Sequence, residues 1–149
     1  MEKIEWNNKT WKELTNEEIE EVFMLRAKVF VVEQNCAYQD IDSYDQKAIH
    51  VLGRKNNKII AYCRAFDEGD FFNEASFGRA LIEKKHRGTG IGHQLVAENL
   101  RIMQEKFKDK KIKISAQAHL SGFYQKHGFK PKGEEYLEDG IPHVAMYKN

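Results

Sequence analysis

Cysteine is scarce in this sequence, with only Cys36 and Cys63 among 149 residues. Their spacing matches neither a zinc site nor a Cys-x-x-Cys redox centre. The six histidines include no His-Glu-x-x-His pair. We therefore predict two free thiols, a reducing cytoplasmic location and no metal site.

A surplus of either charge is missing too. The chain carries 24 Lys and Arg against 23 Asp and Glu, a net charge of +1. Proteins that hold nucleic acid through its phosphates need an excess of basic residues, so we predict no nucleic-acid partner. No apolar run is long enough to cross a bilayer and the N-terminus is charged, so we expect neither a membrane span nor a signal sequence.

Repeats, low-complexity stretches and linkers are also absent, and the chain has only two prolines. A length of 149 residues suits one domain with a sizeable core. We predict a single domain over residues 1–149, in which strands are grouped around two or more helices as a mixed α/β (α+β) fold.

Periodic apolar patterns give the order of the elements. Thr15 and Glu18 have capping-box spacing ahead of a helix whose apolar stripe reaches Phe30. Asn56-Asn57 suits a hairpin turn between two strands. The other expected elements are a strand at 4–11 with a turn at 7–9, an irregular polar segment at 34–47, a strand at 76–82, a helix at 90–107, a strand at 111–116, a short helix at 120–127, and a hairpin of 134–137 and 143–147 around a turn at 139–140.

The most informative stretch, residues 84–92, reads Lys-Lys-His-Arg-Gly-Thr-Gly-Ile-Gly. It lies between a predicted strand and a predicted helix, where close backbone approach and unpaired N–H groups suit a phosphate. A Walker A loop would end in Gly-Lys-Ser/Thr, and this loop does not. The dinucleotide fingerprint needs its third glycine where His93 stands, so neither nucleotide loop fits.

A second motif, Gly-Phe-Tyr-Gln-Lys-His-Gly-Phe at 122–129, follows the next predicted strand. Together with Arg-Gly-Thr-Gly-Ile-Gly at 87–92 it resembles the two cofactor segments of the GNAT N-acetyltransferases. Four further segments closely resemble the ElaA-like subgroup of that family, at 29–36, 38–42, 116–120 and 138–143. The resemblance runs from about Trp11 to the C-terminus. It departs at Gly122, where many relatives carry Asn, so a side-chain contact to the cofactor is absent there.

The resemblance implies the GNAT acyltransferase fold, a mostly antiparallel sheet splayed around acetyl-CoA with flanking helices. The cofactor would lie between the strand ending at Ile82 and the strand from Lys111, with an amide near Leu81 as the oxyanion donor. The cofactor-binding residues implied in this way are Ala80, Leu81, Ile82, Arg87, Gly88, Thr89, Gly90, Ile91, Gly92, Phe123 and Tyr124.

The resemblance also implies that Tyr124 is the general acid for the leaving thiolate, a task that suits a phenol. A base is needed as well, because a protonated amine has no lone pair for attack. The alternatives to a water chain in this role are Glu33, His50 and His119. One acidic segment either lines an acceptor pocket for a cationic amine or is a solvated loop, and it contains Glu33, Gln34, Asp40 and Asp42.

The sequence therefore predicts an acetyl-CoA-dependent N-acetyltransferase that acts on a primary amine of a small molecule or peptide. The alternative is a non-catalytic acyl-CoA sensor with the same fold. A nucleotide-phosphate enzyme ranks last, because both nucleotide loops fail. For the assembly, the resemblance and an exposed sheet edge favour a homodimer.

Overall fold

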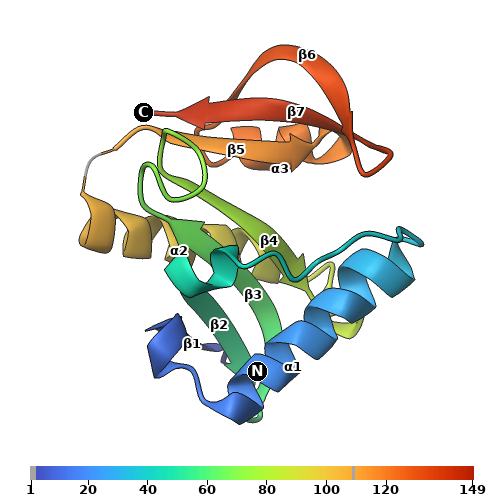
Figure 1. The fold of residues 1–149 in the computed structure, drawn as a ribbon, viewed down its shortest axis with the longest axis vertical. Helices are drawn as coiled ribbons and strands as arrows, with labels where there is room; N and C mark the ends of the chain where they lie inside the picture. The colour runs from blue at the N-terminus through green and yellow to red at the C-terminus, as the bar shows by residue number, and fades with distance from the viewer. Residues whose placement is uncertain (1–2, 109) are drawn as a thin grey trace.

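The computed structural model describes residues 3–108 and 110–149, and Met1, Glu2 and Asp109 lie outside the described residues. Two antiparallel sheets build the fold (Figure 1). The first has the order β1-β2-β3-β4, formed by Glu5–Thr10, Ile49–Lys55, Lys58–Phe66 and Ser76–Ile82. The second has the order β5-β7-β6, and its strands in chain order are Ile112–Gln117, Lys130–Glu138 and Ile141–Lys148. The predicted mixed α/β fold with mostly antiparallel strands is confirmed.

Helices α1 and α2 cover opposite faces of the first sheet (Figure 1). Side chains alternate between the two faces of a strand, so neighbouring residues of β3 meet different helices. Tyr62 packs in the cluster of α1, whereas Cys63 packs in the cluster of α2. The helices are α1 at Asn16–Arg26, which continues as a π-helical segment at Ala27–Glu33, α2 at Ile91–Phe107 and α3 at Ser121–Gln125.

Local sequence signals are confirmed where they concern caps and turns. The hydroxyl of Thr15 accepts a hydrogen bond from the amide of Glu18, whose carboxylate accepts one from the amide of Thr15. Asn56 and Asn57 have φ angles of 53° and 63°, as a tight hairpin turn requires. The expected turn at 7–9 is wrong, because these residues pair with β2 in one continuous strand. Strand pairing outweighs the low strand propensity of asparagine here. The last hairpin also begins earlier than expected, at Lys130.

Strands β4 and β5 are neighbours only where they begin. A single parallel bridge joins Ala75 to Ile112, and the amide of Lys113 donates to the carbonyl of Ala75 at 2.9 Å. Beyond the bridge the two strands diverge (Figure 1). Strand β4 is also bulged opposite β3, with Arg79 in a left-handed conformation at φ 50°. The two sheets are therefore separated at the C-terminal ends of β4 and β5.

A buried network of ion pairs fastens the irregular segment 34–47 to the sheet. It joins three arginines from α1, β3 and β4 to three aspartates of that segment, and we call it the Arg–Asp network: Arg26, Arg64, Arg79, Asp40, Asp42 and Asp45. Arg26 is fully buried, and its guanidinium binds Asp45 at 2.7 Å and Asp40 at 2.8 Å. Arg26 thus lies on the inward face of α1 that the apolar pattern predicts, but as a paired cation.

We expect Asp45→Asn to lower the free energy of unfolding by about 3–5 kcal/mol, because it leaves Arg26 and Arg64 buried with one carboxylate fewer. Chemical denaturation measures this change. Glu20→Gln alters an exposed acid on α1 and should stay within about 0.5 kcal/mol of the wild type. Equal stability of the two variants would show that the Arg–Asp network contributes little.

Candidate active site

The diverging strands β4 and β5 enclose a groove of about 820 Å³. The edge of β4 forms one wall, and the end of β5 with the residues that follow it forms the other. Residues 87–92, which we call the glycine-rich run, close one end. Of the residues predicted to bind the cofactor, those that line the groove are Ala80, Leu81, Ile82, Arg87, Gly88, Gly90, Gly92, Phe123 and Tyr124. Thr89 instead donates its hydroxyl to the carbonyl of His86, and Ile91 is buried beneath the start of α2.

The glycine-rich run presents the start of α2 to the groove. Gly88 and Gly90 have φ angles of 81° and 85°, a region that side-chain-bearing residues rarely enter. Gly90 is the residue before the helix, so the first N–H groups of α2, which lack partners within the helix, lie beside it. This arrangement suits an anionic group such as a phosphate.

Arg87 lies at the same end of the groove. Its Nε donates to the carbonyl of Ile82 at 2.9 Å, and its two terminal nitrogens bind the carboxylate of Glu33. The guanidinium is thereby held between the end of β4 and the end of the helical segment that follows α1.

Tyr124 on α3 lies at the inner end of the groove. Its ring packs among Phe77, Phe123 and Phe129 and is only 8% exposed. Burial raises the pKa of the Tyr124 phenol to about 12, so the hydroxyl keeps its proton at neutral pH. A protonated phenol beside a groove can donate a proton to a developing anion.

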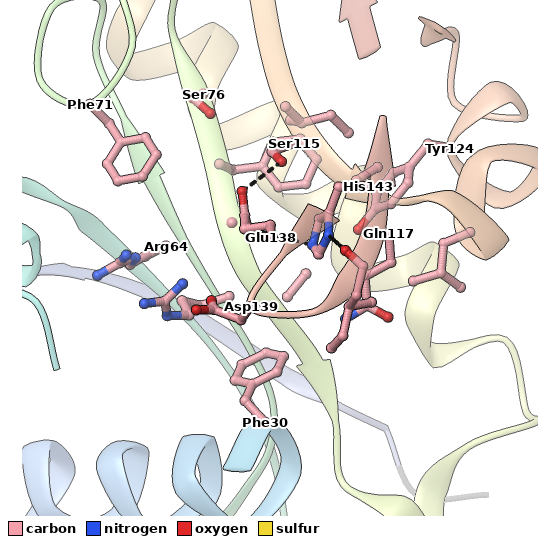
Figure 2. Close-up of a pocket in the computed structure, with 18 of the residues that line it drawn as sticks. Phe30, Arg64, Phe71, Ser76, Ser115, Gln117, Tyr124, Glu138, Asp139 and His143 are labelled. Carbon is pink, nitrogen blue, oxygen red and sulfur yellow. Dashed lines mark hydrogen bonds and ion pairs between the residues drawn. The ribbon is translucent and has the colours of Figure 1, made fainter. Parts of the chain in front are cut away.

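A second, smaller cavity of about 240 Å³ (Figure 2) shares Tyr124 with the groove. Figure 2 shows Glu138, His143 and Tyr124 on one side of this cavity and Arg64 with Phe71 on the other. The groove and the second cavity share seven lining residues: Phe30, Gln34, Ala80, Gln117, Leu120, Tyr124 and Ile141. Two ligands held in them would meet at these residues.

The three candidate bases lie in different surroundings. His50 is buried in the core and lines neither cavity, and burial lowers its pKa. Its Nε2 donates to the carbonyl of Asp45 at 2.9 Å, and its Nδ1 accepts from the hydroxyl of Tyr62 at 2.7 Å. Glu33 lines the groove, where the hydrogen bond from Arg87 lowers its pKa. The exposed His119 lines the groove as well. The structure thus places the last two of these residues in the groove that Tyr124 also lines, and not His50.

The acidic segment behaves differently from both expectations. Gln34 lines both cavities and Glu33 lines the groove, but Asp40 and Asp42 line neither. Both aspartates bind arginines of the Arg–Asp network, and Asp40 is buried whereas the side chain of Asp42 is 21% exposed. For Asp40, the acceptor-pocket and the solvated-loop hypotheses are therefore both wrong.

Sequence reasoning missed the polar residues of the second cavity. Ser115 and Gln117 come from β5, Glu138 from β6 and His143 from β7. A signal for two of them is present in the sequence. The turn at 139–140 fixes the register of the hairpin, which pairs Tyr136 with His143 and so places Tyr136, Glu138 and His143 on one face.

Residues 3–108 and 110–149 contain no group of three His, Cys, Asp or Glu side chains that could hold a metal ion. Within the same residues, no helix has both the length and the apolar character needed to cross a membrane. Cys36 and Cys63 are free thiols.

Comparison with known proteins agrees with this geometry. The family model of the acetyltransferase (GNAT) domain matches residues 10–149. Protein ElaA of Escherichia coli K12 is 41% identical over 145 residues, covering 96% of this chain and 95% of its own. The crystal structure of Escherichia coli ElaA superposes with a TM-score of 0.92 at 40% identity, over 98% of this chain and 99% of that one.

Two other solved structures describe ligands or activities of this fold. An acyl-CoA N-acyltransferase from Pseudomonas aeruginosa has a TM-score of 0.92 at 35% identity, over 97% of this chain and 99% of its own. A GNAT family acetyltransferase from Elizabethkingia anophelis, solved with acetyl-CoA bound, has a TM-score of 0.64 over 99% of each chain. At 19% identity, the second likeness concerns the fold alone.

We expect Gly90→Asp to weaken binding of acetyl-CoA at least about tenfold, which corresponds to about 1.4 kcal/mol. The added carboxylate would repel a pyrophosphate, and the new side chain would strain the backbone at φ 85°. Isothermal titration calorimetry measures the affinity.

Gly69→Asp is the matched control, because Gly69 has nearly the same φ angle, 84°, in open space and lines neither cavity. This variant carries the same charge and a similar backbone strain, and its affinity should stay unchanged. If the two variants bind acetyl-CoA equally well, the glycine-rich run does not hold the phosphates.

Proposed function

The chain belongs to the GNAT acetyltransferase family, and on this premise we propose that it transfers the acetyl group of acetyl-CoA to a primary amine of a small molecule or peptide. The amine attacks directly while both substrates are bound. One observation carries the proposal: the groove with its glycine-rich run shares Tyr124 and six other lining residues with a second cavity. An acyl donor in the groove and an acceptor in the second cavity would therefore meet beside a buried phenol.

Acetyl-CoA is the proposed donor because each part of the groove suits one part of the molecule. The start of α2 and the loop at 87–90 suit the pyrophosphate. The edge of β4 at 80–82 that faces away from β3 offers backbone groups to the amides of the pantetheine arm. A volume of about 820 Å³ lies within the usual range for ligand pockets, about 300–1,000 Å³.

In the proposed reaction, the nitrogen lone pair of the neutral amine forms a bond to the acetyl carbon, and the carbonyl electrons move to oxygen. An amide near Leu81 stabilises this oxyanion. The carbonyl re-forms, the carbon–sulfur bond breaks, and the thiolate takes the proton of Tyr124. The proton that the acetylated nitrogen then loses restores the phenol. The products are an amide and CoA.

A non-catalytic sensor of acyl-CoA is the alternative. A sensor needs the groove, but it needs neither a protonated phenol nor a second cavity at the reacting end. Tyr124 lines both spaces, which favours the enzyme. The cytoplasmic location and the homodimer stay predictions. The free thiols suit a reducing compartment, and β6, exposed along its whole length, is an edge that could pair with a second copy.

Tyr124→Phe tests the proposal, because it removes the proton donor and keeps the ring. We expect kcat for thiol release from acetyl-CoA, measured across a panel of amines, to fall by about a hundredfold or more. The affinity for acetyl-CoA, measured by calorimetry, should not change. Tight binding of acetyl-CoA with no amine-stimulated thiol release in the wild type would favour the sensor.

A further inference from the structure

The second cavity has arginines and carboxylates in its walls, but among the described residues only the arginines are paired with groups of opposite charge. Arg64 and Arg79 line the cavity, but aspartates of the network already bind both guanidinium groups. Glu138 and Asp139 line it as well, and within the described part of the chain neither carboxylate binds a lysine or an arginine. The uncompensated charge at the cavity is therefore negative, which favours a cationic ligand.

His143 lies where this carboxylate charge meets the site of acyl transfer. It stands on the central strand β7, opposite Gln117 of β5 and Tyr136 of β6. Its Nδ1 lies 2.7 Å from the carbonyl oxygen of Ile141, which can only accept, so Nδ1 carries the proton. In the neutral ring Nε2 therefore holds the lone pair, and it lies 3.4 Å from the carboxylate of Glu138.

Glu138 is itself held in place on this face of the hairpin. Its Oε1 accepts a hydrogen bond from the hydroxyl of Ser115 at 3.1 Å (Figure 2), and that hydroxyl also bonds to the hydroxyl of Tyr136. Its Oε2 faces Nε2 of His143. Because the side chain of Glu138 is 48% exposed, a proton that reaches this pair has a path to water.

The other walls of the cavity limit the size and type of the ligand. Aromatic rings surround much of it, among them Phe30, Phe66 and Phe71, and they give the cavity apolar walls that suit an aliphatic chain. About 240 Å³ is less than the usual volume of a ligand pocket. A short aliphatic chain with one or two ammonium groups fits these limits.

We propose that the second cavity binds a compact cationic amine through Glu138 and that His143 takes the proton which this amine must lose before it attacks. This inference rests on the proposed acetyl transfer and names its acceptor class and its base. The ammonium gives one proton to Nε2 of His143, and the electrons of that N–H bond become the lone pair that attacks the acetyl carbon. The imidazolium then faces the carboxylate of Glu138, and its proton passes to water.

His143 suits this role better than the residues that the sequence singles out. Glu33 is bound by Arg87 and lies near the glycine-rich run, where the phosphates are expected. His119 lines only the groove of the donor. His143 alone among these three lines the second cavity, together with Tyr124. His143 and Tyr124 therefore both line the cavity in which the acceptor amine is proposed to bind.

The first experiment compares three-carbon amines that differ only at the far end: propylamine, diaminopropane and β-alanine. We expect kcat/KM to be highest for diaminopropane, whose second ammonium meets the free carboxylates, and lowest for β-alanine, which adds a carboxylate. Glu138→Gln should lower kcat/KM for diaminopropane by roughly fivefold to tenfold. The matched control, Glu135→Gln, changes an exposed acid of β6 that does not line the cavity, and it should behave like the wild type.

The second experiment asks whether His143 moves a proton or only supports the fold. His143→Gln should lower kcat/KM for the amine by about a hundredfold or more. The loss of activity on acidification that the base causes should disappear in this variant and persist in Tyr124→Phe. Imidazole added to His143→Ala should restore part of the rate, which it would not do for a residue that only supports the fold.

A pH profile at this site must be interpreted against all neighbouring groups. Those that line the cavity or stack on His143 come from every element around it: Cys36, Tyr38, Arg64, Arg79, Tyr124, Tyr136, Glu138 and Asp139. Comparison of His143→Gln with Glu138→Gln and Tyr124→Phe separates their contributions. Glu138→Gln and Tyr124→Phe lower the rate but retain His143, so they should retain the loss of activity on acidification.

The outcomes separate this inference from the proposed function. If amines are acetylated but Glu138→Gln and His143→Gln match the wild type, or if β-alanine is the best acceptor, the inference is overturned and acetyl transfer stands. If no amine is acetylated, both acetyl transfer and the role of His143 as base are overturned. Calorimetry with diaminopropane on the CoA-loaded protein then decides the amine site, which requires binding that Glu138→Gln weakens.

Discussion

Strands β4 and β5 touch through one bridge at Ala75 and Ile112 and then diverge. Backbone groups that face the gap have no ladder partner from the other strand there, and they need water or a ligand. The bulge at Arg79 turns β4 further from a regular edge. The glycine-rich run lies at the end of β4 and Tyr124 follows the end of β5, so the divergence alone places them on opposite sides of one space.

The Arg–Asp network fixes the wall of the second cavity. Buried ion pairs are costly to desolvate and add little net stability compared with apolar packing. This network joins α1, β3 and β4 to the segment 34–47, which has little regular structure of its own. It also binds Arg64 and Arg79, which line the cavity. These arginines therefore do not neutralise the carboxylates that face the cavity. Its arrangement therefore sets both the shape and the polarity of the second cavity.

The lining of the groove was predictable from sequence because its signals are local. The glycine-rich run and the Phe123-Tyr124 pair each lie within a few residues of one helix start or on one short helix. The second cavity depends on pairings between distant segments. His50 was a candidate base by its place at the start of a strand, yet the fold buries it against Tyr62 and Asp45. The turn at 139–140 predicts that His143 shares a face with Tyr136 and Glu138, but only the pairing of β7 with both β5 and β6 brings this face to the cavity.

The helical segment after α1 connects the groove and the second cavity. Glu33, at its end, binds Arg87 beside the glycine-rich run, and the thiol of Cys36 donates to the carbonyl of Asp139 in the hairpin turn at 3.3 Å. Between them, Gln34 lines both the groove and the second cavity. Three of the four residues 33–36 thus connect the glycine-rich run, the groove, the second cavity and the hairpin turn. A displacement of this segment would change the groove and the second cavity together, because Gln34 lines both of them.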